Sequence, residues 1–205
     1  MEEYISVNKE AEAEITEKKS RFIAYIKHVE TEDDAALFIN SIKKKNYDAK
    51  HNVFAYILKN GKKKYSDDGE PSKTAGFPIL DMLEKEKVTD VVCVVTRYFG
   101  GTLLGVGGLI RAYTKAAKDC LKNAEVTHQR LCSVLKITSD YAFLEQIKHI
   151  LKSKTAVLSD IEYTDKAAIY IIVPEEDEDL IKNSISDETG NAASFEKIKN
   201  TYYAI

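Results

Sequence analysis

Three carboxylates within four positions give the sequence its first group of residues with chemical potential. Asp67, Asp68 and Glu70 form this group, and His51 precedes them. Such residues could hold Mg²⁺ or carry out acid–base chemistry with the imidazole. Because a glycine and a proline stand beside them, an Asx turn explains the aspartates equally well. We therefore predict a polar site at these four residues and assign no metal to it.

A glycine-rich stretch between Arg97 and Arg111 is the second group. Main-chain N–H groups at the start of a helix attract anions, and guanidinium groups fork onto phosphate. The alternative is a glycine-rich turn that only allows close packing. Five of the nine glycines of the chain lie within nine residues here: Gly100, Gly101, Gly105, Gly107 and Gly108.

Known nucleotide-binding and nucleophile patterns do not fit this stretch. A P-loop needs Lys and Ser or Thr after Gly105, where Val106 and Gly107 stand, and the dinucleotide fingerprint is broken at Ile110. No Gly-x-Ser-x-Gly elbow is present either. We predict no catalytic residue and no cofactor.

Further basic and aromatic residues could add to an anion site. Tyr98 is available to stack on a base, and Lys62, Lys63 and Lys64 could contact phosphates. The formal net charge is −3, but residues 1–128 hold 21 Lys and Arg against 20 Asp and Glu, while the remainder hold 9 against 13. A polyanion is therefore expected to meet the first part of the chain.

Predicted secondary structure places these residues at the ends of strands and helices. The Val-rich run 91–97 is typical of a strand buried on both faces, and apolar residues at helical spacing follow from Leu109 to Leu121. A strand over 52–58 leads through an Asn-Gly hairpin turn, and a polar loop over 66–78 follows. A strand over 20–29 and a helix capped by Thr31 precede them.

The pattern changes near residues 124–130, where we place a domain boundary. The second part predicts the order β-α-β-β-α-β, with Asp140 capping the first helix, which is typical of the ferredoxin-like motif. The expected domains are 1–128 and 129–205.

The three cysteines are expected to be buried reduced thiols. No apolar segment is long enough to span a membrane, and the acidic N-terminus predicts a cytoplasmic protein.

Two long motifs in the same order closely resemble the YigZ/IMPACT family. They are residues 66–71 (Ser-Asp-Asp-Gly-Glu-Pro) with 74–78 (Thr-Ala-Gly-x-Pro), and residues 95–113 (Val-Thr-Arg-Tyr-Phe-Gly-Gly-x-Leu-Leu-Gly-x-Gly-Gly-Leu-x-Arg-Ala-Tyr). The match covers roughly residues 17–123, and the smaller C-terminal domain of the family is expected after it.

The resemblance implies an α+β fold, with a first domain like domain 2 of ribosomal protein S5 and a ferredoxin-like second domain. This pair resembles domains IV and V of elongation factor G, which act on the ribosome. Eukaryotic members regulate translation with an additional N-terminal interaction domain, which we expect this sequence to lack. The expectation is therefore a bacterial-type member.

These observations predict a translation-associated regulator whose first domain binds RNA or the ribosome through phosphate contacts. One alternative is a small-molecule enzyme that uses the glycine-rich loop for a phosphate or nucleotide, with Mg²⁺ on the carboxylates. The other is a protein–protein adaptor that recruits a partner through the acidic second domain.

Overall fold

A computed structural model of the chain describes residues 3–204 and divides it into two compact units. Residues 4–127 form the first unit, and residues 128–204 with Glu3 form the second. Met1 and Glu2, which belong to the acidic N-terminus noted above, lie outside the described residues.

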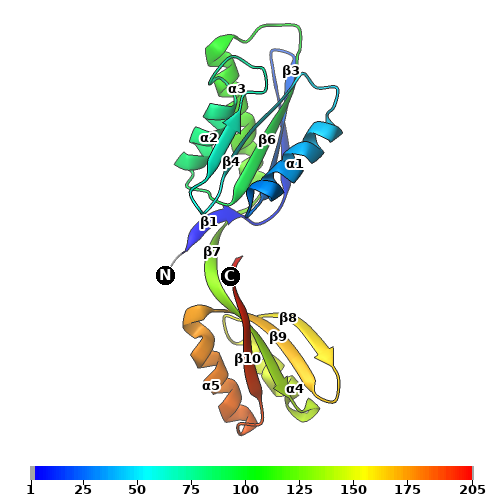
Figure 1. Ribbon diagram of the computed structural model, residues 1–205, viewed down its shortest axis with the longest axis vertical. Helices are drawn as coiled ribbons and strands as arrows, with labels where there is room; N and C mark the ends of the chain where they lie inside the picture. The colour runs from blue at the N-terminus through cyan, green and yellow to red at the C-terminus, as the bar shows by residue number, and fades with distance from the viewer. Residues whose placement is uncertain (1–2, 205) are drawn as a thin grey trace. The chain divides into compact units, whose positions relative to one another are not determined.

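The first unit is a five-stranded antiparallel sheet with helices on both faces (Figure 1). Helices α2 (Gly76–Lys85) and α3 (Gly105–Asn123) cover one face, and α1 (Glu32–Lys45) covers the other. The strand order is β2 (Ala11–Glu17), β3 (Ser20–His28), β6 (Val91–Tyr98), β4 (His51–Ile57) and β5 (Lys63–Ser66).

Strand β6 lies in the middle of this sheet and is buried on both faces. Val91, Cys93 and Val95 face the core under α2 and α3, while Val92 and Val94 face the core under α1. A strand covered on both sides has no place for alternating polar residues. The prediction from the Val-rich run is confirmed.

Local signals in the first unit also behave as predicted. The Thr31 hydroxyl accepts a hydrogen bond from the Asp34 amide at 3.1 Å and caps α1, whose last turn ends in lysines. Gly61 adopts a φ of +85° between β4 and β5, as an Asn-Gly hairpin turn requires.

Strands β1 (Tyr4–Val7) and β2 were not predicted from the sequence. Strand β2 reads Ala-Glu-Ala-Glu-Ile-Thr-Glu, and both Ala and Glu favour helices when isolated. In the structure, Ala11, Ala13 and Ile15 pack against the core while the intervening glutamates face solvent. The period-2 pattern decides the conformation over the intrinsic preference.

The second unit has the predicted order β-α-β-β-α-β. Its antiparallel sheet runs β10-β7-β9-β8, and the two α-helices pack over one apolar core. These elements are β7 (Val126–Ser139), α4 (Leu144–Lys152), β8 (Val157–Tyr163), β9 (Ala167–Pro174), α5 (Glu178–Thr189) and β10 (Ser194–Ala204), with short 3-10 turns at Tyr141–Phe143 and Glu175–Asp177.

One helix cap predicted for this unit is wrong. The Asp140 side chain makes no capping hydrogen bond and instead forms an ion pair with Lys166 at 3.3 Å. A 3-10 turn separates Asp140 from α4, so its carboxylate stands one turn too early to cap that helix.

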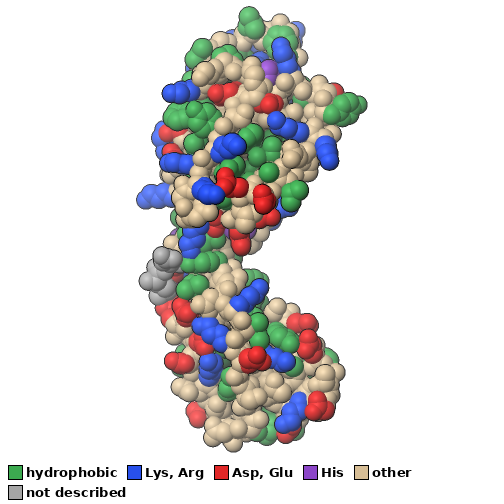
Figure 2. All heavy atoms as spheres, viewed as in Figure 1, with side chains coloured by type: hydrophobic (Ala, Val, Ile, Leu, Met, Phe, Trp, Pro, Cys, Tyr) green, Lys and Arg blue, Asp and Glu red, His purple; other side chains and the backbone are tan. Residues whose placement is uncertain are grey.

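Lys, Arg, Asp and Glu side chains are interspersed over the face of each unit seen in Figure 2. Within residues 3–204, no helix is both long enough and apolar enough to cross a membrane.

Candidate functional site

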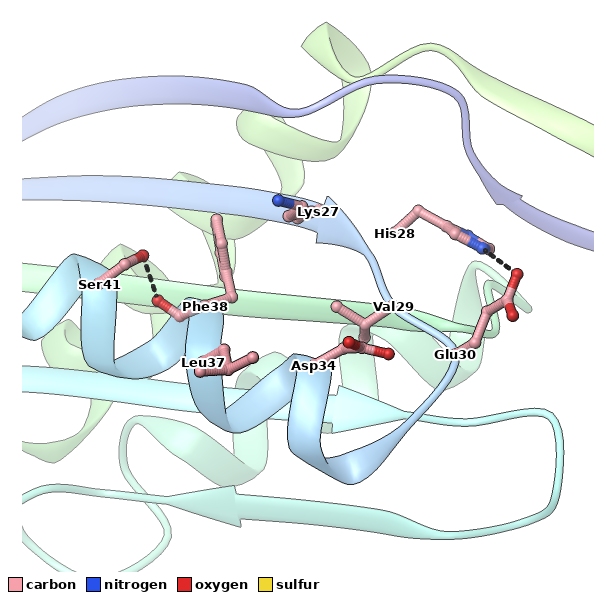
Figure 3. A pocket seen from close by; sticks show the side chains of 8 residues that line it. All are labelled: Lys27, His28, Val29, Glu30, Asp34, Leu37, Phe38 and Ser41. Carbon is pink, nitrogen blue, oxygen red and sulfur yellow. Dashed lines mark hydrogen bonds and ion pairs between the residues drawn. The ribbon is translucent and has the colours of Figure 1, made fainter.

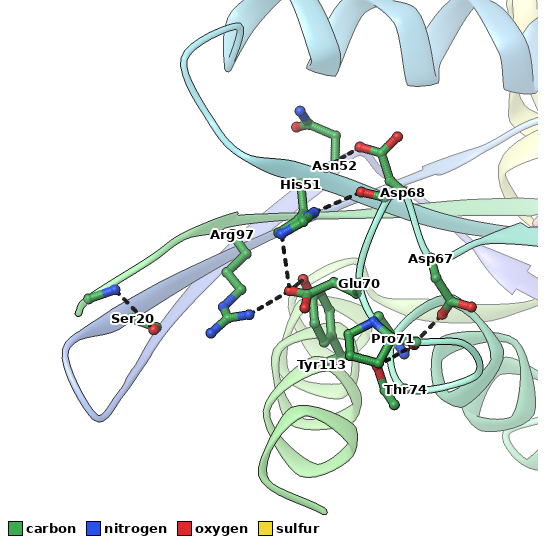
Figure 4. A network of polar contacts seen from close by, with 12 residues as sticks. Ser20, His51, Asn52, Asp67, Asp68, Glu70, Pro71, Thr74, Arg97 and Tyr113 are labelled. Carbon is green, nitrogen blue, oxygen red and sulfur yellow. Dashed lines mark hydrogen bonds and ion pairs between the residues drawn. The ribbon is translucent and has the colours of Figure 1, made fainter. Parts of the chain in front are cut away.

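A buried polar cluster joins the two groups of residues that the sequence singled out (Figure 4). His51 on β4 and Arg97 on β6 are direct cross-strand partners, and the loop after β5 brings Glu70 against both. The Arg97 Nη1 donates to Glu70 Oε1 at 2.6 Å, and the Tyr113 hydroxyl from α3 donates to the same oxygen at 2.8 Å. His51 Nε2 lies 3.9 Å from that oxygen.

The loop that carries Glu70 is held by two aspartates. Asp67 accepts hydrogen bonds from the main-chain amides of Lys73, Ala75 and Gly76, and so caps the start of α2 from a distance in sequence. The Asp68 carboxylate accepts from the Asn52 amide at 2.7 Å and from Lys43 at 3.1 Å, while its carbonyl bonds His51 Nδ1 at 2.7 Å.

The three carboxylates therefore have different roles. Asp67 and Asp68 fix the loop, and Glu70 is the counter-charge of a buried guanidinium. Within the described chain, no three His, Cys, Asp or Glu side chains gather closely enough to hold a metal ion.

Burial controls the electrostatics of this cluster. Tyr113 is fully buried, and burial together with the adjacent Glu70 carboxylate raises the pKa of its hydroxyl far above the usual range. The Tyr113 hydroxyl therefore remains a hydrogen-bond donor. Arg97 is only 6% exposed, and its Nε has no acceptor among the described residues. A buried donor left without a partner in the protein is unusual.

A pocket of about 530 Å³ opens above the cluster. It lies between the loop that joins β5 to α2 (residues 67–75, the Glu70 loop) and the loop that joins β6 to α3 (residues 99–104, the glycine-rich loop). His51, Glu70 and Arg97 form its polar floor, and Lys50 lies at its edge. Its walls are apolar and come from Pro71, Phe99, Leu103, Leu104, Val106 and Leu109.

The glycine-rich loop is the other side of this pocket. Gly100 packs so closely against the turn between β2 and β3 that an added Cβ would lie 2.0 Å from the Lys19 carbonyl carbon. Gly105 begins α3 with a φ of +68°, a conformation that favours glycine. The close approach of Gly100 and the positive φ of Gly105 together set the path of the loop.

Most main-chain N–H groups of this loop and of the first turn of α3 have no hydrogen-bond acceptor within the described residues. From Gly101 to Gly107, no main-chain N–H donates to another residue of the described chain, and Leu104 provides no side-chain cap for α3. Gly101, Gly105, Val106 and Gly107 are exposed. The N-terminus of a 19-residue helix therefore faces the pocket opening with its donors unused.

Not all of the predicted anion-binding residues lie at the N-terminus of α3. Arg111 is exposed and its Nη1 lies over Gly107, where an added Cβ would be 3.5 Å away. Arg97 is internal. Tyr98 donates its hydroxyl to Asp48 at 3.0 Å, and the Arg21 guanidinium lies 5.6 Å from its ring centre. Phe99 is 50% exposed, and the Arg97 guanidinium lies 5.6 Å from its ring centre.

Lys62, Lys63 and Lys64 lie at the other end of the sheet. Lys63 pairs with Ile57, six residues along β4 from His51, which is about 20 Å. Lys62 forms an ion pair with Glu32, and Lys63 forms one with Glu84. The structure does not bring this cluster to the glycine-rich loop.

Three lysines near the loop were missed by sequence reasoning. Lys18 and Lys19 form the exposed turn between β2 and β3, with φ values of +45° and +67°, and Lys50 borders the pocket. Lys-Lys is not a typical turn sequence for positive φ, so the hairpin gave no local signal. Among the described residues, none of the three forms an ion pair.

A second hollow lies between β3 and α1 (Figure 3). Its polar groups pair with neighbours: His28 bonds the Ser6 hydroxyl at 2.8 Å and lies 3.6 Å from Glu30, and Lys27 lies 3.5 Å from Glu10. This hollow carries no unpaired buried group within the described residues. The better candidate is the pocket beside α3.

Two family models match separate parts of the chain. The profile of the Impact N-terminal domain matches residues 18–121, and a domain of unknown function (DUF1949) matches residues 137–192. Fold and site together define an α+β protein with two antiparallel sheets, helices and a glycine-rich loop beside a buried Arg–Glu pair.

The chain belongs to the IMPACT family. It is 36% identical over 201 residues to the IMPACT family member YvyE of Bacillus subtilis (strain 168), covering 97% of this chain and 93% of YvyE. It is 32% identical over 163 residues to the member YigZ of Escherichia coli (strain K12), covering 77% and 79%. A solved structure titled "Crystal structure of an hypothetical protein" matches with a TM-score of 0.63 and 26% identity, over 97% and 98% of the two chains. The predicted family is thereby confirmed.

Proposed function

We propose that the chain is a cytoplasmic, translation-associated protein whose first unit binds RNA, including ribosomal RNA, around the N-terminus of α3. The observation that carries this proposal is the row of unused amide donors from Gly101 to Gly107. A phosphate group placed there would meet both the donors and the positive end of the helix dipole.

The charges around this helix end support the proposal. Residues 91–118 contain no Asp or Glu, and Arg111, Lys18, Lys19 and Lys50 are exposed without an ion pair in the described chain. These four cations come from three different segments of the first unit. Unpaired cations around open amides favour a ligand with several phosphates over one with a single anion.

Apolar groups next to the cations indicate single-stranded RNA as the form bound. Phe99, Leu103 and Val106 are 50%, 84% and 60% exposed at the edge of the pocket. Unpaired RNA bases stack on such side chains, whereas a double helix keeps its bases covered.

The fold of each unit adds a reason for the link to translation. We propose that the first unit is like domain 2 of ribosomal protein S5, and that the second, with strand order β10-β7-β9-β8 around two helices, is ferredoxin-like. Both assignments follow the family resemblance to domains IV and V of elongation factor G. That argument is one of fold analogy, so the binding experiment decides it.

The experiment is a salt titration of binding between the whole chain and a labelled single-stranded RNA. The logarithm of the affinity should fall linearly with the logarithm of salt concentration, with a slope of about −0.7 for each phosphate contacted. Arg111→Ala and Lys19→Ala should each weaken binding. Each should also make the slope less steep by about 0.7, the value for one phosphate contact.

Lys63→Ala is the matched control, because Lys63 is paired with Glu84 at the far end of the sheet. Its affinity and slope should equal those of the unchanged chain. Absence of salt-dependent binding, or equal losses from Lys63→Ala and Arg111→Ala, would refute the proposal.

A further inference from the structure

The pocket beside α3 has a shape and a polar floor that the binding of phosphates alone does not use. Its volume of about 530 Å³ is within the range of roughly 300–1,000 Å³ typical of small-ligand sites. Building on the proposed RNA binding, we infer that this pocket takes one unstacked guanine base of the bound RNA.

The floor combines unused acceptors with unused donors. A carboxylate has about four lone-pair positions, and Arg97 and Tyr113 occupy two of those on Glu70, both at Oε1. Glu70 Oε2 accepts nothing from the part of the chain that the structure describes. Arg97 uses Nη1 for this bond, and its Nη2, which is not among the fully buried atoms, donates to no acceptor in the described residues.

The charge of Glu70 decides which end of a nucleotide enters. A phosphate at the floor would meet this buried carboxylate, whereas at the pocket opening it meets the open amides of Gly105 to Gly107 and the Arg111 guanidinium. The phosphate therefore stays outside and the base points inward. Apolar walls suit the base, since its flat ring can lie on Phe99.

Guanine is the base whose edge matches the floor. Its Watson–Crick edge offers two adjacent donors, N1–H and the N2 amino group, beside the O6 acceptor. The two free lone-pair positions of Glu70 accept the two donors, and the Arg97 guanidinium donates to O6. Adenine, cytosine and uracil each present only one donor group on that edge, so each would leave one of the two free acceptor positions of Glu70 unpaired.

The test compares single-stranded RNAs that differ at one central position, measured by fluorescence anisotropy with the whole chain. In a uridine background, a central guanosine should bind about 10-fold more tightly than adenosine, cytidine or uridine. Inosine, which lacks only the N2 amino group, should lose most of that preference. Because inosine changes the RNA and not the protein, this arm does not depend on how a variant folds.

Protein variants complete the test. Phe99→Ala should reduce the guanosine preference by removing the stacking surface. Phe77→Ala is the matched control, because Phe77 is 43% exposed on α2 and does not line the pocket. It should leave the preference unchanged.

The outcomes separate the two proposals. Salt-dependent binding that is equal for all four bases, or for guanosine and inosine, would overturn the guanine pocket and leave RNA binding intact. Loss of preference in both phenylalanine variants would also overturn it. No salt-dependent binding to any of the RNAs would overturn both proposals.

Discussion

The pairing of Glu70 with Arg97 shows how one residue can serve both stability and binding. Glu70 neutralises a guanidinium that is 6% exposed, and it holds the loop against β4 and β6 through that bond. Three segments of the chain thus meet at a single carboxylate oxygen.

Replacing Glu70 by Gln should destabilise the first unit by about 3–5 kcal/mol, because Arg97 would keep a buried charge without its counter-ion. Urea denaturation measures the change in the free energy of unfolding. The control is Glu12→Gln, which breaks an exposed ion pair with Lys45 and should cost less than about 1 kcal/mol. Equal effects of the two substitutions would show that the Arg97 charge is solvated.

Gly100 and Gly107 should respond differently to the same substitution. Gly100→Ala places a Cβ 2.0 Å from the Lys19 backbone, so the loop or the turn must move, at a cost of about 1–3 kcal/mol. Gly107→Ala meets only the end of the Arg111 side chain at 3.5 Å, and an alanine in the first turn of a helix should be neutral or slightly stabilising. Thermal unfolding compares them, and a stable Gly100→Ala variant would contradict the close approach.

Residue types in the sequence indicated the polar site, but they did not indicate which of its carboxylates bonds main-chain amides and which one bonds Arg97. Asp67, Asp68 and Glu70 have the same charge, and only the folded loop directs two of them to amides and the third to Arg97. Likewise, the three consecutive lysines 62–64 were conspicuous in the sequence. Lys18 and Lys19 lie next to the glycine-rich loop because the hairpin between β2 and β3 places them there, and that hairpin has no local sequence signal.

At the scale of elements, the pattern of apolar residues was the reliable signal. Strand β6 was predicted from a continuous Val-rich run, and helix α3 from apolar residues at helical spacing. Strand β2 was missed because it is built of helix-favouring residues, and its conformation depends on its neighbour β3. Tertiary contacts that decide a conformation cannot be deduced from a short segment alone.

The start of α5 should make the second unit sensitive to acid. Burial acts to raise the pKa of Glu178, but hydrogen bonds from Lys182, Ser133 and Lys197 outweigh it and lower the pKa to about 2. The pKa is lower in the folded state than its ordinary value of 4.5, so the ionised group stabilises the fold above that pH. This contribution is lost as the pH falls from about 4.5 toward 2.

Glu178→Gln should therefore weaken the dependence of the second unit on pH. We expect the free energy of unfolding, measured by urea denaturation, to be lower at pH 3 than at pH 7. This decrease should be about 1–2 kcal/mol smaller in the variant than in the unchanged chain. Glu145→Gln is the control, because Glu145 pairs with Lys148 at an exposed position of α4. An unchanged pH response in Glu178→Gln would contradict the assignment.

Across the whole molecule, three buried thiols report on the two units separately. Cys93 and Cys120 belong to the first unit and Cys132 to the second. Burial raises the pKa of all three thiols, that of Cys120 to about 12. A buried thiol that stays protonated reacts slowly.

Labelling with a thiol reagent at pH 8 should therefore be slow for all three cysteines, and it should accelerate when urea unfolds the unit that contains each one. Mass spectrometry after partial labelling assigns each rate to its residue. Cys93 and Cys120 should become reactive together, because both lie in the same core. Fast labelling of Cys93 in the native protein would contradict its burial inside the central strand.

The anchoring of the Glu70 loop by Asp67 has a consequence for how quickly a partner can be captured. Three amides tied to one side chain keep this segment in a fixed conformation before any encounter. A receptor that is already in its final conformation loses little chain entropy on complex formation. Association rates should then be set by diffusion and long-range charge attraction, and not by a slow rearrangement of the protein.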